Sequence, residues 1–326
     1  MAHGAGALRG AGVRELDVVR AIGGLLPPAP GEVLVPVGDD CAAVRLGGTV
    51  WVAAADMLVE GHHFLGGLAA PEDVGYKAVA VNVSDVAAMG GVPRFVLCSG
   101  GAPEAEAVLR CFRGVAEACA AFGAYPLGGD TTRAGALTVD VAILGEVPGG
   151  RPVLRSGAVP GDLLAVTGEL GAAAAGLLAL RRGEGGFGRL VGRHLRPEPR
   201  VREGLEAALL GAHAMIDLSD GLATDAGHLC ERSGVGCRID LRRLPVSGEV
   251  RRLAEAAGED AEVLAATGGE DYELLVAAPE GTLRELARRL SVPLTVVGEV
   301  VEGGGVSFHR GGEPVEGLAG WDHFRA

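Results

Sequence analysis

Acidic residues recur at the ends of apolar segments, beside glycines and once inside a long apolar stripe. Any one of them taken alone is more often a turn or cap residue than a ligand. Carboxylates gathered without cysteine and with few histidines are the hard oxygen ligands that suit magnesium or manganese rather than zinc or copper. The candidate set is Asp40, Asp56, Asp85, Asp130, Asp217 and Asp220, with Asp39, Glu270 and Asp271 as further candidates.

Glycines stand next to many of these acids, at Gly38, Gly128-Gly129, Gly221 and Gly268-Gly269. Glycine allows backbone amides to approach phosphate oxygens closely. The chain has neither a Walker lysine motif nor a kinase-type catalytic loop, so if it handles a nucleotide it does so by another architecture. Acids and glycine turns together indicate magnesium-nucleotide chemistry.

Residues 75–91 contain the only lysine, Lys77, and the only asparagine, Asn82, and the chain has no glutamine. Apolar residues at helical spacing predict a helix here, with Pro71 in its first turn. Asp85 then lies in an apolar stripe, where an ionised carboxylate is costly unless it is paired or bound to a metal. Two simpler interpretations remain open: Asp85 braces a neighbouring element, and Lys77 pairs with Asp73 one turn earlier.

Length and composition favour a two-domain protein. A chain of 326 residues exceeds the usual size of one core. We therefore predict two domains, over residues 1–148 and 149–326, divided at the breaker-rich segment 148–152. Both halves alternate strand and helix patterns, which predicts a mixed α/β fold. Strands are expected over 50–55, ending at Asp56, and over 124–127, ending in the glycine turn 128–133.

Charge and cysteine usage exclude other classes. The net charge of -13 and the absence of a basic run disfavour nucleic-acid binding. No apolar run is long enough to span a membrane, and the first twelve residues lack the pattern of a signal peptide. The six cysteines show no zinc-ligand spacing, which favours reduced structural thiols in a cytoplasmic protein.

A series of motifs resembles one enzyme family in order and over nearly the whole chain. They are GDDCAAV (38–44), ADMLVEGHHF (55–64), YKAVAVNVSDVAAMG (76–90), GGDTTR (128–133), RSGAVPGD (155–162), HLRPEPR (194–200), IDLSDGL (216–222), GGEDYEL (268–274) and GWDHF (320–324). This set resembles the thiamine-monophosphate kinase family. The broader superfamily, whose members share the acidic N-terminal motifs, includes aminoimidazole ribonucleotide synthetase, selenophosphate synthetase and a hydrogenase maturation factor.

The resemblance implies ATP-dependent phosphorylation of thiamine monophosphate to thiamine diphosphate. It implies an aminoimidazole ribonucleotide synthetase-like fold, in a homodimer whose N-terminal domains pair their sheets. Residues 1–148 would then form the ATP- and Mg-binding, dimerising domain, and residues 149–326 the domain that completes the substrate site. It also implies several Mg²⁺ ions, held by the residues that match the family's ligands, and specific contacts to ATP and to the acceptor. The implied metal ligands are Asp40, Asp56, Asp85, Asp130, Asp217 and Asp220, of which Asp85, Asp130 and Asp220 are the expected catalytic residues. The implied ATP contacts are Gly129, Asp130, Arg155 and Ser219, and the implied acceptor contacts are His63, Glu270 and Trp321.

Several alternatives remain open. His63 could be an ordinary interfacial histidine, Trp321 a tail anchor and Arg155 a solvated linker residue. The family usually has a Ser-Thr pair before the acid at position 56, whereas this chain has Ala54-Ala55, so one metal site is expected to be weaker or completed by water. The competing functions are another ATP-using synthetase of the superfamily and a non-catalytic Mg-nucleotide-binding protein.

Overall fold

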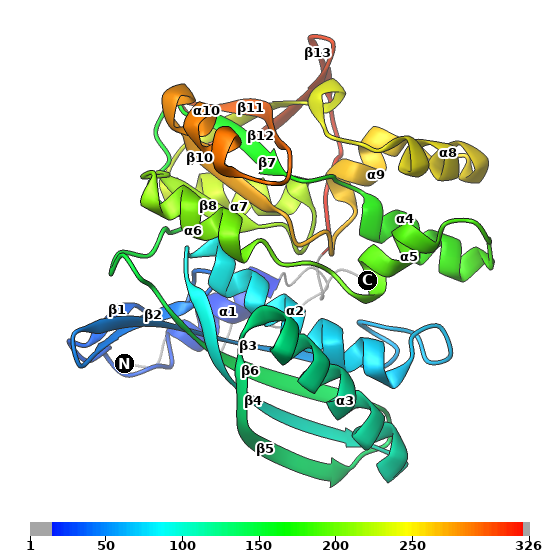
Figure 1. The fold of residues 1–326 in the computed structure, drawn as a ribbon. Coiled ribbons are helices and arrows are strands. Elements are labelled where there is room, and N and C mark those ends of the chain that lie inside the picture. The colour runs from blue at the N-terminus through cyan, green and yellow to red at the C-terminus, as the bar shows by residue number, and fades with distance from the viewer. Residues whose placement is uncertain (1–14, 322–326) are drawn as a thin grey trace.

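Two β-sheets, one from each half of the chain, are joined by helices in the computed structural model, which describes residues 15–321 (Figure 1). Within these residues the first sheet has the strand order β1-β2-β3-β6-β4-β5. Its pairs are antiparallel except for the parallel pair β4/β5. Its strands are β1 (Val33–Val35), β2 (Ala42–Leu46), β3 (Thr49–Val59), β4 (Val92–Ala102), β5 (Tyr125–Arg133) and β6 (Thr138–Glu146).

The second sheet has the order β13-β12-β9-β11-β7-β10-β8 and is antiparallel apart from the pair β12/β9. Its strands are β7 (Leu163–Thr167), β8 (Ala214–Asp217), β9 (Gly236–Asp240), β10 (Leu274–Ala278), β11 (Leu294–Val301), β12 (Gly305–Arg310) and β13 (Glu313–Val315). The remaining helices of this half are α4 (Ala172–Arg182), α5 (Gly188–Leu195), α6 (Val201–Leu209), α7 (Leu222–Ser233), α8 (Gly248–Ala257), α9 (Ala261–Thr267), α10 (Glu280–Arg289) and the short 3-10 helix η1 (Leu241–Arg243). The expected mixed α/β architecture is confirmed.

Helix α2 (Pro71–Ala88) lies between the two halves of the molecule (Figure 1). It packs with α3 (Ala105–Phe122) over one face of the first sheet and also touches β8 and α6 of the second half. The two helices approach so closely that a Cβ at Gly75 would overlap the carbonyl oxygen of Cys111. The helix is therefore buried on nearly all sides, and any polar residue on it must meet a partner or a ligand.

The face of the first sheet opposite α2 and α3 carries apolar side chains that are about half exposed or more. They come from β3, β4 and β5 and are Met57, Leu97, Tyr125 and Leu127. All nine residues of β5, at the edge of the sheet, are exposed. In the part of the chain that the structure describes, no helix covers this face of the sheet, and α1 (Glu15–Gly23) lies elsewhere (Figure 1).

Two expected strand ends are wrong. Strand β3 does not end at Asp56 but continues to Val59, because Asp56 pairs with Val141 in the ladder to β6. The segment 128–133 is not a turn, because its backbone continues β5 and pairs in parallel with β4. The sequence pattern does not indicate strand β2 or helices α5 and α9. The predicted boundary at 148/149 falls between β6 and β7 and stays a prediction.

Candidate functional site

Three buried or partly buried carboxylates meet where the two halves of the chain face each other. Asp40 lies in the loop between β1 and β2, Asp85 near the end of α2, and Asp217 at the end of β8. One carboxylate oxygen of each lies within 4.8 Å of the others. Oxygen ligands gathered at this separation suit a hard divalent cation. The sequence predicted all three, although residues 40 and 217 are far apart in the chain.

The electrostatics of this cluster favour a bound cation. Burial, reinforced by the charges of Asp56, Asp217 and Asp40, raises the pKa of Asp85 well above its usual value. Burial and the charge of Asp40 raise the pKa of Asp217 to about 8, although Ser84 Oγ donates to Asp217 Oδ2 at 2.6 Å and opposes the rise. The Oδ2 atom of Asp40 is buried and has no hydrogen-bond partner in the described residues. An unpartnered carboxylate oxygen among repelling carboxylates is what a metal ion would satisfy.

Arg155 forms one wall of the cluster and is not a solvated linker residue. Its Nε and Nη2 donate to Asp40 Oδ1 at 3.1 and 2.7 Å, and its backbone amide donates to Asp39 at 3.2 Å. Burial, helped by the charge of Asp40, raises the pKa of Asp39 to about 6. One guanidinium thus faces several carboxyl groups and cannot balance all of their charges when they are ionised. It is also placed to bind a phosphate beside them.

A second acidic group follows β8. Asp220, Asp225 and His228 have ligand atoms within 4.8 Å of one another. Asp225 is buried and accepts a hydrogen bond from the backbone amide of Asp220 at 3.1 Å, and the backbone amide of Trp321 donates to the Asp220 carbonyl at 3.0 Å. The sequence interpretation named Asp220 and Trp321 but missed Asp225 and His228. Their i, i+3 spacing on α7 places them on one helix face, a signal that the sequence offered.

Glu270 is held by partners from both halves of the molecule. Lys77 Nζ lies 2.5 Å from Glu270 Oε1, and His194 Nδ1 lies 3.1 Å from Oε2. Its backbone amide donates to the Ser219 carbonyl at 2.7 Å. The simpler alternative, a pair between Lys77 and Asp73, is wrong, because Lys77 pairs with Glu270 and Asp73 accepts from Arg196 at 2.6 Å. The lysine thus serves the site and not only its own helix.

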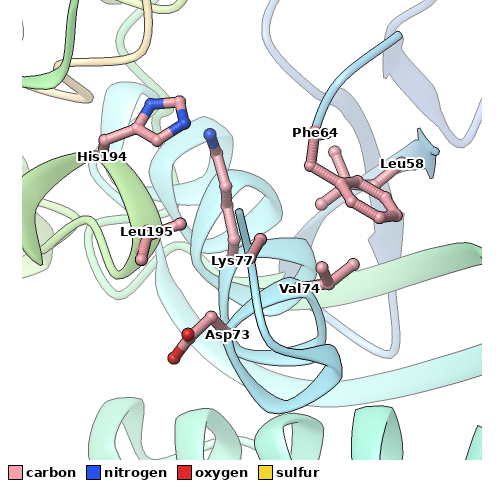
Figure 2. A pocket seen from close by; sticks show the side chains of 8 residues that line it. Leu58, Phe64, Asp73, Val74, Lys77, His194 and Leu195 are labelled. Atoms are coloured by element: carbon pink, nitrogen blue, oxygen red, sulfur yellow. The ribbon is translucent and has the colours of Figure 1, made fainter. Parts of the chain in front are cut away.

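A small recess opens beside this ion pair. Figure 2 shows Lys77 extending toward the imidazole of His194, with Phe64 and Leu58 across from them. The other lining residues are Ala69, Asp73, Val74 and Leu195. Nearby, His63 accepts a hydrogen bond at Nδ1 from the Val59 amide at 3.1 Å, which is a local turn contact. The recess is mostly apolar, with an ionic rim.

Asp130 is not brought to the carboxylate cluster. It is exposed on β5 and accepts from the Thr131 amide at 2.8 Å. The ladder runs from Asp56 in β3 through β6 and β4 to Gly129 in β5. Asp56 and Gly129 are therefore three strand spacings apart, which is roughly 14 Å. A Cβ at Gly129 would overlap the Cys98 carbonyl group, so the glycine allows the two strands to approach.

The raised pKa values predict a pH-dependent stability of the metal-free protein. Asp217 has a folded pKa of about 8 against an ordinary 3.8, so its contribution is fully present below 3.8 and is lost as the pH rises through 8. We expect the free energy of unfolding in chelator to fall by at most about 1.4 kcal/mol per pH unit for this group from pH 6 to about 8 and then to level off, with the melting temperature following it.

Differential scanning fluorimetry of Asp217→Asn and Asp240→Asn checks this expectation. The amide that replaces the Asp217 carboxylate cannot titrate, so the slope should flatten. Asp240 accepts a hydrogen bond from the Arg242 amide near the surface, so the Asp240→Asn variant should retain the wild-type slope. Equal slopes in all three proteins would contradict the assignment.

Comparisons with known proteins agree with this arrangement. Residues 38–147 match the family described as AIR synthase related protein, N-terminal domain, and residues 159–311 match its C-terminal domain. The thiamine-monophosphate kinase of Escherichia coli K12 is 41% identical over 90% of this chain and 93% of its own length. That of Mycobacterium tuberculosis H37Rv is 38% identical over 90% of this chain and 87% of its own length.

Solved structures are similar as well. One described as AaThiL complexed with AMPPCP and TMP has a TM-score of 0.83 at 36% identity, covering 95% of this chain and 97% of that one. The thiamine-monophosphate kinase of Stenotrophomonas maltophilia K279a has a TM-score of 0.75 at 35% identity, covering 92% and 96%. No helix within residues 15–321 is both long and apolar enough to cross a membrane. Two matched domains and an identity above one third over nine-tenths of the sequence show that this chain belongs to the thiamine-monophosphate kinase family.

Proposed function

We propose that this protein transfers the γ-phosphoryl group of ATP to the phosphate of thiamine monophosphate. A phosphate oxygen of the acceptor forms the new bond to the γ-phosphorus, the bond between that phosphorus and the β,γ-bridging oxygen breaks, and ADP leaves. The supporting observation is the cluster of Asp40, Asp85 and Asp217 with Arg155 beside it, in a chain of this family. The second pKa of a phosphate monoester is about 6, so the acceptor is mostly dianionic at neutral pH and needs no strong base.

We further propose that the carboxylates hold Mg²⁺. When bound, Mg²⁺ would neutralise the repelling phosphates and align the in-line transfer. Asp40, Asp85 and Asp217 fit it because their oxygens converge and one buried oxygen lacks a partner within the described residues. The other proposed ligands are Asp56, Asp130 and Asp220. Neither side chain of Ala54-Ala55 offers an oxygen, so a ligand there must be backbone or water.

The chain's own groups supply orientation. The guanidinium of Arg155, fixed on Asp40, binds a phosphate of ATP, and Ser219 and Gly129 contact the nucleotide through polar or backbone atoms. Glu270 and His63 line the acceptor side. Trp321, whose backbone is tied to Asp220 and whose side chain is exposed, stacks its indole on a flat cationic ring.

We propose that the active form is a homodimer built on the uncovered face of the first sheet. Exposed apolar side chains on that face suit association, and a two-fold axis would bring β5 of one subunit to the other. This arrangement gives exposed Asp130 a role, because the partner subunit's Asp130 would complete the site that Asp40 and Asp85 begin. We place the enzyme in the cytoplasm, since its six cysteines are buried thiols without disulfides.

Coupled ADP release tests the function. With ATP and Mg²⁺ we expect turnover on thiamine monophosphate and none on free thiamine, which lacks the preionised phosphate and whose alcohol would need a base. We also expect none on an aminoimidazole-pathway substrate. Thiamine monophosphate formed from thiamine would contradict the acceptor assignment. Tight ATP binding without turnover on any acceptor would favour the non-catalytic alternative.

A further inference from the structure

Lys77 is a buried cation whose role the proposed reaction leaves open. Lys77 is 3% exposed, and its ammonium forms an ion pair with Glu270 from the opposite half of the chain. Lys77 and Ser84 are seven residues apart, two turns of α2, so both lie on the helix face that meets the second half. Ser84 contacts Asp217 there at 2.6 Å. This face of α2 therefore holds two site carboxylates of the second half in place.

Glu270 needs such support. Its backbone φ is 68°, in the left-handed region that a residue with a Cβ occupies only at a cost. Its side chain is 29% exposed, so it is not closed off from solvent. Two partners fix it: Lys77 on Oε1, and His194 of α5 on Oε2. Burial opposes ionisation of Glu270, but these partners outweigh it and lower its pKa to about 2.

The same carboxylate is linked to the nucleotide side. The Glu270 amide donates to the Ser219 carbonyl, and Gly269 packs so closely on that carbonyl that a Cβ there would overlap its oxygen. A shift of the 268–271 loop would therefore move Ser219 as well as Glu270. The contacts of Lys77 and His194 with Glu270 therefore also fix the position of Ser219 relative to Glu270.

We propose that Lys77 is a positioning residue for acceptor recognition: by clamping Glu270 across the two halves, it presents an ionised carboxylate to the cationic ring of the acceptor. This inference rests on the proposed function, because it concerns the acceptor of that reaction. The compact ammonium suits a buried point contact, whereas a planar guanidinium needs more room. Lys77 acts through Glu270 and does not touch the reacting phosphates.

Steady-state kinetics of four proteins test this: wild type, Lys77→Met, Glu270→Gln and the double variant. Lys77→Met is expected to raise KM for thiamine monophosphate about 30-fold, with kcat within about threefold and KM for ATP within about twofold. In the Glu270→Gln background, Lys77→Met should change KM for the acceptor by less than about twofold, because its target is already neutral. Arg284→Met, which breaks an exposed pair with Glu280, is the control and should match wild type.

The comparison of Glu270→Gln with the double variant decides the question even where Lys77→Met fails to fold. Glutamine can still accept a hydrogen bond from the Lys77 ammonium, and the double variant leaves no unpaired buried charge. A further large loss in the double variant would mean that Lys77 contacts the substrate directly, which overturns the proposal. An equal rise in KM for ATP would overturn it as well. A wild-type protein that turns over no thiamine monophosphate would instead refute the proposed function itself.

Discussion

Asp85→Asn is expected to lower kcat at least about 10³-fold and to raise the melting temperature of the metal-free protein by a few degrees. The two effects share one cause. Asp85 shares its site with Asp40 and Asp217, and its pKa is raised by burial and by the charges around it. Asparagine cannot carry the charge that repels Asp40 and Asp217 in the metal-free protein, but the substitution also removes a proposed ligand for Mg²⁺ and should weaken the proposed alignment of the phosphates.

The measurement pairs ADP release with scanning fluorimetry in chelator and with Mg²⁺ titration. The Asp85→Asn variant should show weaker Mg²⁺ binding together with higher metal-free stability, whereas a merely structural aspartate would lose stability and activity together. Asp240→Asn is the matched control, because its site is remote and asparagine can still accept from the Arg242 amide. Full activity in Asp85→Asn would remove the cluster from the mechanism.

The sequence predicted those parts of the site that local patterns determine. Helix α2 follows from apolar spacing behind Pro71, and the strand that carries Asp217 as its last residue follows from a short apolar run. The convergence of Asp40, Asp85 and Asp217 was an expectation from ligand chemistry and from the family resemblance. The structure brings these three together.

Contacts between distant segments could not be predicted from local spacing. Lys77 has a candidate partner one turn earlier in Asp73, but Asp73 is taken by Arg196, and Lys77 pairs with Glu270 instead. His194 reaches Glu270 because α5, which the sequence pattern did not indicate, lies beside α2. Glycines 128 and 129 suggested a turn, yet ladder pairing with β4 keeps them extended, and only the sheet order shows how far Asp130 lies from Asp56.

The distance of Asp130 from the carboxylate cluster of its own chain leads to a second prediction, which concerns mixed dimers. Asp85→Asn and Asp130→Asn are each expected to be nearly inactive as homodimers. When the two are unfolded together or co-expressed so that subunits mix, activity should recover to about a quarter of wild type, because half the dimers are mixed and each mixed dimer holds one intact site. The intact site combines Asp85 of one subunit with the partner subunit's Asp130.

Recovery of activity in mixed dimers distinguishes a site that uses Asp130 of the same chain from one that uses the partner subunit's Asp130. Single variants cannot distinguish the two. If Asp130 served the cluster of its own chain, every site in the mixture would carry one substitution, and activity would stay at the level of the parents. Mixing Asp85→Asn with Asp217→Asn gives the control, because these residues lie in one cluster of one chain. In that mixture no site is intact, so no recovery is expected. Recovery confined to the pair containing Asp130→Asn would mean that the sheet face left uncovered in one subunit is where two chains build a shared site.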